Sequence, residues 1–259
     1  MALLPTVMVL VDISGYTRFI TYRTISLIHA EQIITELLES VLDQAEFPLQ
    51  LNKLEGDAAF LFAVVPPEAA RTAVLRDVLA QVEAFFAVFA RRREQLGHDV
   101  ERCRCDACQG VLDLRLKAFI HPGEVLFKQV HGLEELAGED VILLHRLLKN
   151  RVGLDEYILM SKEVATAALC DRRADWGRPH HESYDVGTVT LHLAPPPGTM
   201  LPPLPPSTFL SRLRLRLRFM TRLLRKLWSR RRPNYRHLPA AEVSFGSFVA
   251  EAKEMHRHP

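Results

Sequence analysis

Hydrophobic residues cluster and alternate along the first 194 residues in a pattern that predicts several strands. Val7–Ile13 is a continuous apolar run, which is typical of a central strand buried on both faces. Leu49–Leu54 and Ala58–Val64 flank the turn Glu55-Gly56-Asp57 and predict a hairpin. Further strands are predicted at Leu112–Ile120, Gly123–Val130, Tyr157–Met160 and Val186–Leu193.

Helical periodicity fills the intervals between these strands. Apolar residues recur at three- and four-residue spacing over Leu27–Asp43, and residues 68–96 carry one long helical pattern that ends at Gly97. Shorter helices are predicted at Val141–Leu148 and Lys162–Ala168. Hairpins mixed with crossover helices predict an α+β sandwich, with a mixed or antiparallel sheet and helices on one face.

The character of the chain changes after Ala194. Residues 1–194 are expected to form the folded domain, and the proline-rich residues 195–206 a semi-rigid linker. Residues 207–232 predict a basic amphipathic helix, and residues 233–259 a C-terminal tail. A leucine stripe flanked by arginines over residues 209–232 fits an anionic membrane surface. Its alternating Leu-Arg core also fits a strand, and packing on the domain or on a partner stays an alternative.

Composition and charge limit the classes of function. The chain is 48% hydrophobic and 25% charged with a net charge of +2, as in a globular protein, which argues against nucleic acid as its main partner. The apolar N-terminal run lacks a basic region and a cleavage site, and no stretch resembles a membrane span. We therefore expect a cytoplasmic protein, with the basic segment as a peripheral contact to the inner face of the membrane.

Two carboxylates stand at the ends of predicted strands. Asp12 ends the first strand, and Asp57 lies at the tip of the hairpin. Side chains in these two places can converge on one pair of metal ions, and carboxylate oxygens are ligands that Mg²⁺ or Mn²⁺ prefers. Taken singly, Asp12 is also interpretable as a helix cap and Asp57 as an ordinary turn residue.

Three segments together resemble the class III adenylate/guanylate cyclase superfamily. They are Asp12-Ile13-Ser14-Gly15-Tyr16-Thr17, Lys53-Leu54-Glu55-Gly56-Asp57, and Gly138-Glu139-Asp140-Val141 followed by Arg146-Leu147. The resemblance spans about residues 5–193 and implies a ferredoxin-like nucleotide-cyclase sandwich. The C-x-C-x2-C segment and residues 145–150 are similar to an uncharacterised bacterial branch, in which a shared fold does not guarantee a shared activity.

The resemblance implies a role for each matched residue. Asp12, the backbone carbonyl of Ile13 and Asp57 would bind Mg²⁺ or Mn²⁺. Backbone N–H groups of the turn that follows would cradle the phosphates of a nucleoside triphosphate, and this turn comprises Ser14, Gly15, Tyr16 and Thr17.

The base-reading half of the site is matched in part. Lys53 corresponds to a lysine that favours adenine, and Glu135 takes the place of its partner aspartate with one extra methylene. Arg146 corresponds to the catalytic arginine that stabilises charge on the α-phosphate. Ile142 replaces the asparagine that orients the ribose, and Lys162 is a candidate for the triphosphate-binding lysine.

Two functions follow from these matches. The first is a nucleotide cyclase that converts a nucleoside triphosphate, with ATP favoured, to a 3′,5′-cyclic nucleotide. The second is a catalytically weak or inactive nucleotide-binding signalling module, associated with a membrane or a partner protein. Because the family's sites form between two subunits, the resemblance implies a homodimer with two equivalent sites.

A second metal site is a separate hypothesis. Cys103, Cys105 and Cys108 place three thiols within six residues, and such thiolates can bind Zn²⁺ with a fourth ligand such as His98 or Cys170. Three reduced loop cysteines, or a redox-active pair among them, are the alternatives. His121 and His145 are interpreted as packed histidines that hydrogen-bond to the backbone rather than as ligands.

Overall fold

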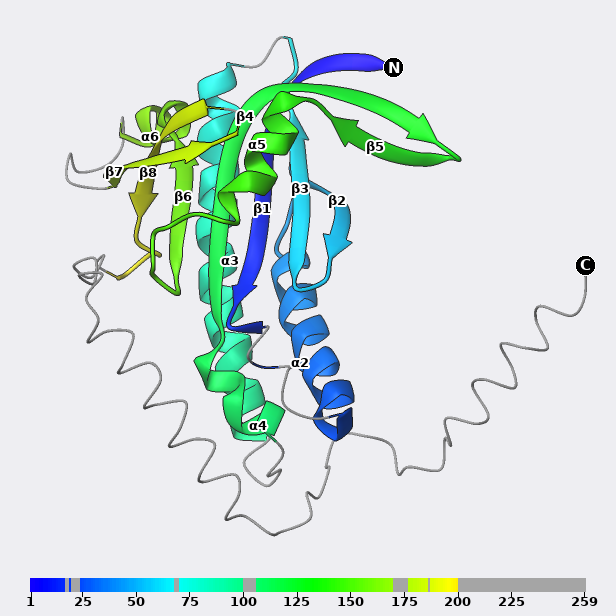
Figure 1. The fold of residues 1–259 in the computed structure, drawn as a ribbon, viewed down its shortest axis with the longest axis vertical. Coiled ribbons are helices and arrows are strands. Elements are labelled where there is room, and N and C mark those ends of the chain that lie inside the picture. Colours follow the sequence, from blue (N-terminus) through cyan, green and yellow to red (C-terminus); the bar gives the residue numbers. More distant parts are fainter. Residues whose placement is uncertain are drawn as a thin grey trace, which may run out of the picture.

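The computed structural model describes residues 1–16, 19, 24–67, 70–99, 106–169, 177–185 and 187–199. Thr17, Cys103, Cys105 and the predicted segments 207–232 and 233–259 lie outside the described residues. The described part is an α+β fold built on one mixed sheet (Figure 1), which confirms the predicted fold class. Among the described residues, no helix combines the length and apolarity needed to span a bilayer.

The sheet has the strand order β2-β3-β1-β4-β6-β8-β7, and β5 pairs with the far end of β4. β4 and β6 run parallel, and the other neighbours run antiparallel. The strands are β1 (Ala2–Ser14), β2 (Gln50–Glu55), β3 (Ala58–Val64), β4 (Arg115–Val130), β5 (Leu133–Ala137), β6 (Tyr157–Ser161), β7 (Arg178–Tyr184) and β8 (Gly187–Ala194).

Helices cover both faces of the sheet, so the expectation of helices on one face is wrong. α2 (Thr24–Leu42), α3 (Arg71–Asp99) and α6 (Lys162–Leu169) share one hydrophobic core with alternate side chains of β1, such as Val9. α5 (Glu139–Leu147) shares a second core with the intervening side chains, such as Leu10. Because β1 is apolar at every position from Val7 to Val11, both of its faces must be buried.

β4 is one long strand, where the sequence predicted two strands separated by Pro122-Gly123. Along this stretch β4 pairs with β1, but β6 pairs with β4 only as far as Ile120, and the pairing of β4 with β5 starts only at Leu126. Pro122 therefore lies where one edge of β4 has no neighbouring strand, and its missing N–H costs no ladder hydrogen bond. Figure 1 shows β4 and β5 continuing beyond the sheet as a two-stranded arm.

Three further elements were not predicted. β5 and β7 are short, and β7 is an edge strand of mostly polar residues, so neither shows the apolar alternation by which strands are recognised. The predicted cysteine loop ends in a short helix, α4 (Asp106–Gly110), followed by a 3-10 turn at Val111–Asp113. Ala107 and Cys108 of α4 are buried in the core of α2 and α3.

Candidate functional site

The fold brings the two predicted metal-binding aspartates together. Asp12 near the end of β1 is in register with Ala58, the residue that follows Asp57. The Ile13 N–H donates to the Asp57 carbonyl at 3.2 Å, which fixes the hairpin tip against β1. Burial, followed by the charge of Asp12, raises the pKa of Asp57 to about 6. Burial also raises the pKa of Asp12.

The charge of Asp12 raises the pKa of Asp57, and burial raises the pKa of both carboxylates, so together they form a site that favours a cation. Each is partly removed from water, and like charges at close range destabilise the doubly ionised state. A divalent ion would relieve both effects, and oxygen donors of this type suit Mg²⁺ or Mn²⁺. Among the described residues, no group of three or more His, Cys, Asp or Glu side chains could hold a metal ion. A metal here would therefore need further ligands, such as phosphate oxygens.

Lys117 is a third charged residue at this site, and the sequence reasoning did not find it. It lies on β4 in register with Asp12, and its charge lowers the pKa of both aspartates against the stronger effect of burial. Its ammonium group lies 5.6 Å from the ring centroid of Tyr157 on β6. Lys117 alternates with buried apolar residues along β4, as an ordinary strand lysine does, so only the register of β4 against β1 shows that it lies beside Asp12.

The predicted phosphate-binding turn begins where β1 ends. Ser14 is buried, and Gly15 has a φ of +96°, which favours glycine and lets the chain leave the strand. The Tyr16 hydroxyl donates to the carboxylate of Glu31 on α2 at 2.7 Å. Burial and this hydrogen bond raise the pKa of Tyr16 to about 12. Three of the four predicted residues are thus placed beside the aspartates, and Thr17 lies outside the described residues.

The two predicted base-reading residues also meet, within a group that we call the Lys53 cluster (Lys53, Glu55, Glu135 and His145). The Lys53 ammonium lies 3.3 Å from a carboxylate oxygen of Glu55 and 3.8 Å from one of Glu135. The Glu55 oxygen also lies 3.1 Å from Nε2 of His145 on α5. Burial would raise the pKa of Glu55, but His145 and Lys53 outweigh it and hold this pKa below its usual value.

Arg146, the predicted catalytic arginine, lies on α5 next to His145 and half exposed. Its Nη2 contacts the carboxylate of Asp185 at 2.7 Å, in the turn between β7 and β8. Ile142 lies one helical turn earlier, and 51% of its surface is exposed. Contacts within the described parts of the chain thus divide the predicted residues into the aspartate pair, the Lys53 cluster and Arg146.

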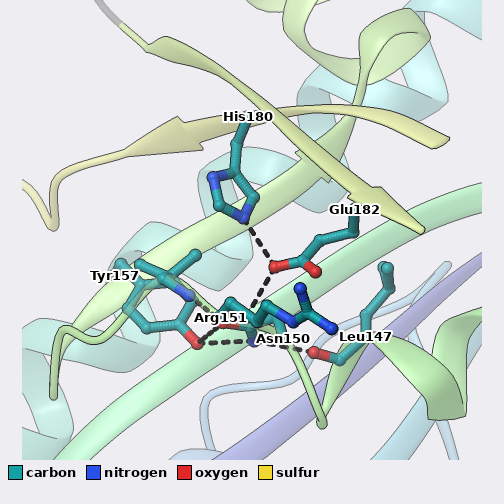
Figure 2. Close-up of polar contacts among 7 residues, drawn as sticks. Leu147, Asn150, Arg151, Tyr157, His180 and Glu182 are labelled. Atoms are coloured by element: carbon teal, nitrogen blue, oxygen red, sulfur yellow. Dashed lines mark hydrogen bonds and ion pairs between the residues drawn. The ribbon is translucent and has the colours of Figure 1, made fainter. Parts of the chain in front are cut away.

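A buried hydrogen-bond network anchors the C-terminal end of α5 (Figure 2). The Asn150 amide nitrogen donates to the Leu147 carbonyl and to the Tyr157 hydroxyl, both at 2.7 Å. The Tyr157 hydroxyl donates back to the amide oxygen of Asn150 at 3.0 Å. Because Tyr157 also lies beside Lys117, this network connects the end of α5 to the neighbourhood of Asp12.

The same region contains the buried carboxylate of Glu182 on β7, which is 4% exposed. It accepts hydrogen bonds from the Arg151 backbone N–H and from the His180 ring (Figure 2). A buried charge with these partners is satisfied, so it holds the segment after α5 against β7.

His121 ties the N-terminal end of α5 to the sheet. Its ring contacts the Ser161 hydroxyl through Nδ1 and the Asp140 carboxylate through Nε2, the latter at 3.0 Å. Asp140 also accepts from the Glu124 N–H at 2.9 Å, and its carboxyl lies over Gly123, where a Cβ would come within 2.2 Å of it. The interpretation of His121 as a backbone-bonded histidine is therefore wrong. His145 does donate to the Val141 carbonyl, in addition to its contact with Glu55.

The structure describes only one of the three cysteines of the proposed zinc site. Cys108 is buried, with its Sγ 3.4 Å from Nδ1 of His29 on α2. Cys103, Cys105 and Cys170 lie outside the described residues, as does the side chain of His98.

Comparison with solved structures finds the same fold in nucleotide cyclases. The adenylyl cyclase CyaB from P. aeruginosa is similar with a TM-score of 0.56 and 14% identity, covering 77% of this chain and 98% of that one. The guanylyl cyclase Cya2 is similar with a TM-score of 0.54 and 13% identity, covering 74% and 92%. At this level of identity the similarity shows a cyclase-like fold.

Sequence comparison finds a nearer relative. Residues 34–157 match the sequence model of a family described as "Protein of unknown function (DUF2652)". The chain is also 36% identical over 174 residues to "Uncharacterized protein Rv2561/Rv2562" of Mycobacterium tuberculosis, an alignment that covers 67% of this chain and 78% of the relative. The chain therefore belongs to the same protein family as this uncharacterized mycobacterial protein, and it has the fold of a nucleotide cyclase domain.

Proposed function

We propose that the protein is a divalent-metal-dependent nucleotide cyclase that converts ATP to a 3′,5′-cyclic nucleotide and pyrophosphate. The observation that carries the proposal is the pair Asp12 and Asp57, two partly buried carboxylates whose pKa values are both raised, in a chain with a cyclase-like fold. Two such carboxylates held close together lower the free energy of unfolding of the metal-free protein. A pair of this kind is expected where a protein binds a cation.

The aspartate half of the site would hold the triphosphate. Asp12, Asp57 and the Ile13 carbonyl would bind Mg²⁺ or Mn²⁺, which when bound neutralises phosphate charge during attack of the 3′-oxygen on the α-phosphorus. Lys117, beside both aspartates, would add a fixed cation near the phosphates. Backbone N–H groups after β1 would bind phosphate oxygens where a helix begins.

The other half would bind the base. Lys53 can donate to a ring nitrogen of adenine, and Glu135 can accept from the exocyclic amine beside it. Arg146 would exchange Asp185 for the α-phosphate, where negative charge develops as pyrophosphate leaves. Because the Lys53 cluster and the aspartate pair are separate groups in one chain, we propose that two copies complete each site. One copy would supply the aspartates, and the other would supply Lys53, Glu135 and Arg146.

The test is product formation by the purified full chain with Mn²⁺ and each of the four common nucleoside triphosphates. We expect a 3′,5′-cyclic product from ATP, identified by mass and chromatography, and its loss in Asp12→Ala and Asp57→Ala. The catalytic proposal fails if none of the four triphosphates yields a cyclic product.

A nucleotide-binding signalling module with little or no turnover is the second candidate. The exposed Ile142 favours it, because an aliphatic side chain offers no hydrogen bond where the family has an asparagine that orients the ribose. Metal-dependent ATP binding without product would support this candidate.

Two proposals concern segments that lie wholly or partly outside the described residues. The basic segment 207–232 would bind anionic membranes, and equal liposome co-sedimentation of the full chain and of a chain ending at Pro195 would exclude it. Cys103, Cys105 and Cys108 would bind Zn²⁺, and protein purified anaerobically without zinc would exclude that site.

A further inference from the structure

The Lys53 cluster contains two side chains, Glu55 and His145, beyond the pair that would read a base. Glu55 lies two residues from Lys53 on β2, and its Oε1 contacts both the Lys53 ammonium and the ring of His145. Lys53 thus stands between two carboxylates, at 3.3 Å from Glu55 and 3.8 Å from Glu135. The two carboxylates therefore compete for hydrogen bonds from one lysine ammonium group.

The contacts of His145 determine which of its ring nitrogens can donate a hydrogen bond to Glu55. Nδ1 lies 2.8 Å from the Val141 carbonyl, which only accepts, so Nδ1 carries a proton. Nε2 lies 3.1 Å from the Glu55 carboxylate and donates to it when the ring carries its second proton. The ring of Phe60 meets the imidazole edge to face, with centroids 5.3 Å apart, and holds it in this orientation.

We propose that His145 is a positioning residue that sets base recognition through Glu55. When its Nε2 donates to Glu55, His145 satisfies the carboxylate that would otherwise hold Lys53, and it leaves Lys53 shared with Glu135 and able to donate to a nucleobase. The inference rests on the proposed function, because it assumes that Lys53 and Glu135 meet the base.

Removal of the imidazole has a defined consequence. In His145→Ala, Glu55 keeps Lys53 as its close cationic partner in the cluster, and the ammonium is drawn away from Glu135. Adenine needs a donor to its ring nitrogen and an acceptor for its exocyclic amine. In this variant the base loses the donor, Lys53. The triphosphate contacts, which belong to the separate aspartate pair, are unchanged.

The experiment compares two ligands by titration calorimetry on the full chain with Mn²⁺: ATP, and inorganic tripolyphosphate, which has the charge but no base. We expect wild type to bind ATP more tightly than tripolyphosphate. His145→Ala should reduce this preference about five- to tenfold while tripolyphosphate affinity stays constant. His145→Gln, which keeps a neutral donor, should restore part of the preference. His181→Ala, an exposed histidine on β7, is the matched control and should behave as wild type.

A double-mutant cycle with Glu55→Gln shows whether His145 acts through Glu55. If it does, His145→Ala causes no further loss of preference in the Glu55→Gln background, whereas additive losses would overturn the inference. An unchanged ATP preference in His145→Ala would also overturn it while leaving the proposed function intact. If wild type binds neither ligand with Mn²⁺, the proposed function fails and the inference fails with it.

Discussion

Replacing Asp57 by asparagine should stabilise the metal-free protein at neutral pH, although it removes a proposed metal ligand. Burial and the neighbouring Asp12 raise the pKa of Asp57 from its ordinary value of 3.8 to about 6. The folded protein therefore holds this proton more tightly than the unfolded chain does. As the pH rises from about 4 to about 6, the free energy of unfolding falls, and it stays reduced above that range.

The magnitude follows from the size of the shift. About two pKa units correspond to about 3 kcal/mol at full effect. The side chain is only partly buried, and solvent screening reduces the expected gain for Asp57→Asn to about 1–2 kcal/mol. For a domain of this size that gain raises the melting temperature by roughly 3–6 °C.

The assay is urea unfolding of wild type and Asp57→Asn, with chelator present, at about pH 8 and about pH 4. We expect the variant to be more stable at the higher pH and its gain to be much smaller at the lower one, where the folded protein holds the proton and the unfolded chain holds it in part. A gain that is the same at both pH values, or a loss at the higher pH, would refute the electrostatic reasoning. Added Mn²⁺ should reduce the difference in unfolding free energy between the variant and wild type, because only wild type keeps both aspartate ligands and is stabilised by the bound ion.

Three further predictions concern neighbouring contacts. Lys117→Met removes the cation that favours the ionised aspartates, so the unfolding free energy in chelator at about pH 8 should fall by about 1 kcal/mol, opposite in sign to the substitution above. Gly123→Ala places a Cβ against the carboxyl of Asp140 and should cost about 1–3 kcal/mol; an unchanged urea midpoint would contradict this. Tyr157→Phe deprives Asn150 of a buried partner and should cost about 1–2 kcal/mol by the same assay, with a cost near zero counting against the network.

The parts of the fold that could be predicted are those whose pattern is local. The apolar run of β1 and the glycine turn between β2 and β3 are each set by neighbouring residues, and both were found. β4 was divided because Pro122 normally ends a strand, and only the missing neighbour at that edge explains why it does not. β7 was missed because an edge strand can be polar on both faces.

The candidate site likewise contains residues that a local pattern predicts and residues that only the assembled fold brings together. Asp12 and Asp57 each lie in a short motif, so sequence was sufficient to pair them. The approach of Lys117 to Asp12 depends on the register of β4 against β1, which no local pattern specifies. The contact of His145 with Glu55 joins residues 90 positions apart and depends on how α5 packs on the sheet. Such contacts become visible only when the elements are assembled.

The most direct test of the account is a count of bound Mn²⁺ by electron paramagnetic resonance, with ATP present, in wild type and in Asp12→Asn. Asparagine keeps the size of the side chain and removes the charge, so the fold should be retained. The account predicts that wild type binds Mn²⁺ with ATP and that the variant loses this binding. Equal Mn²⁺ binding by the two proteins would contradict the claim that the aspartates at the end of β1 and at the β2–β3 turn form a metal site.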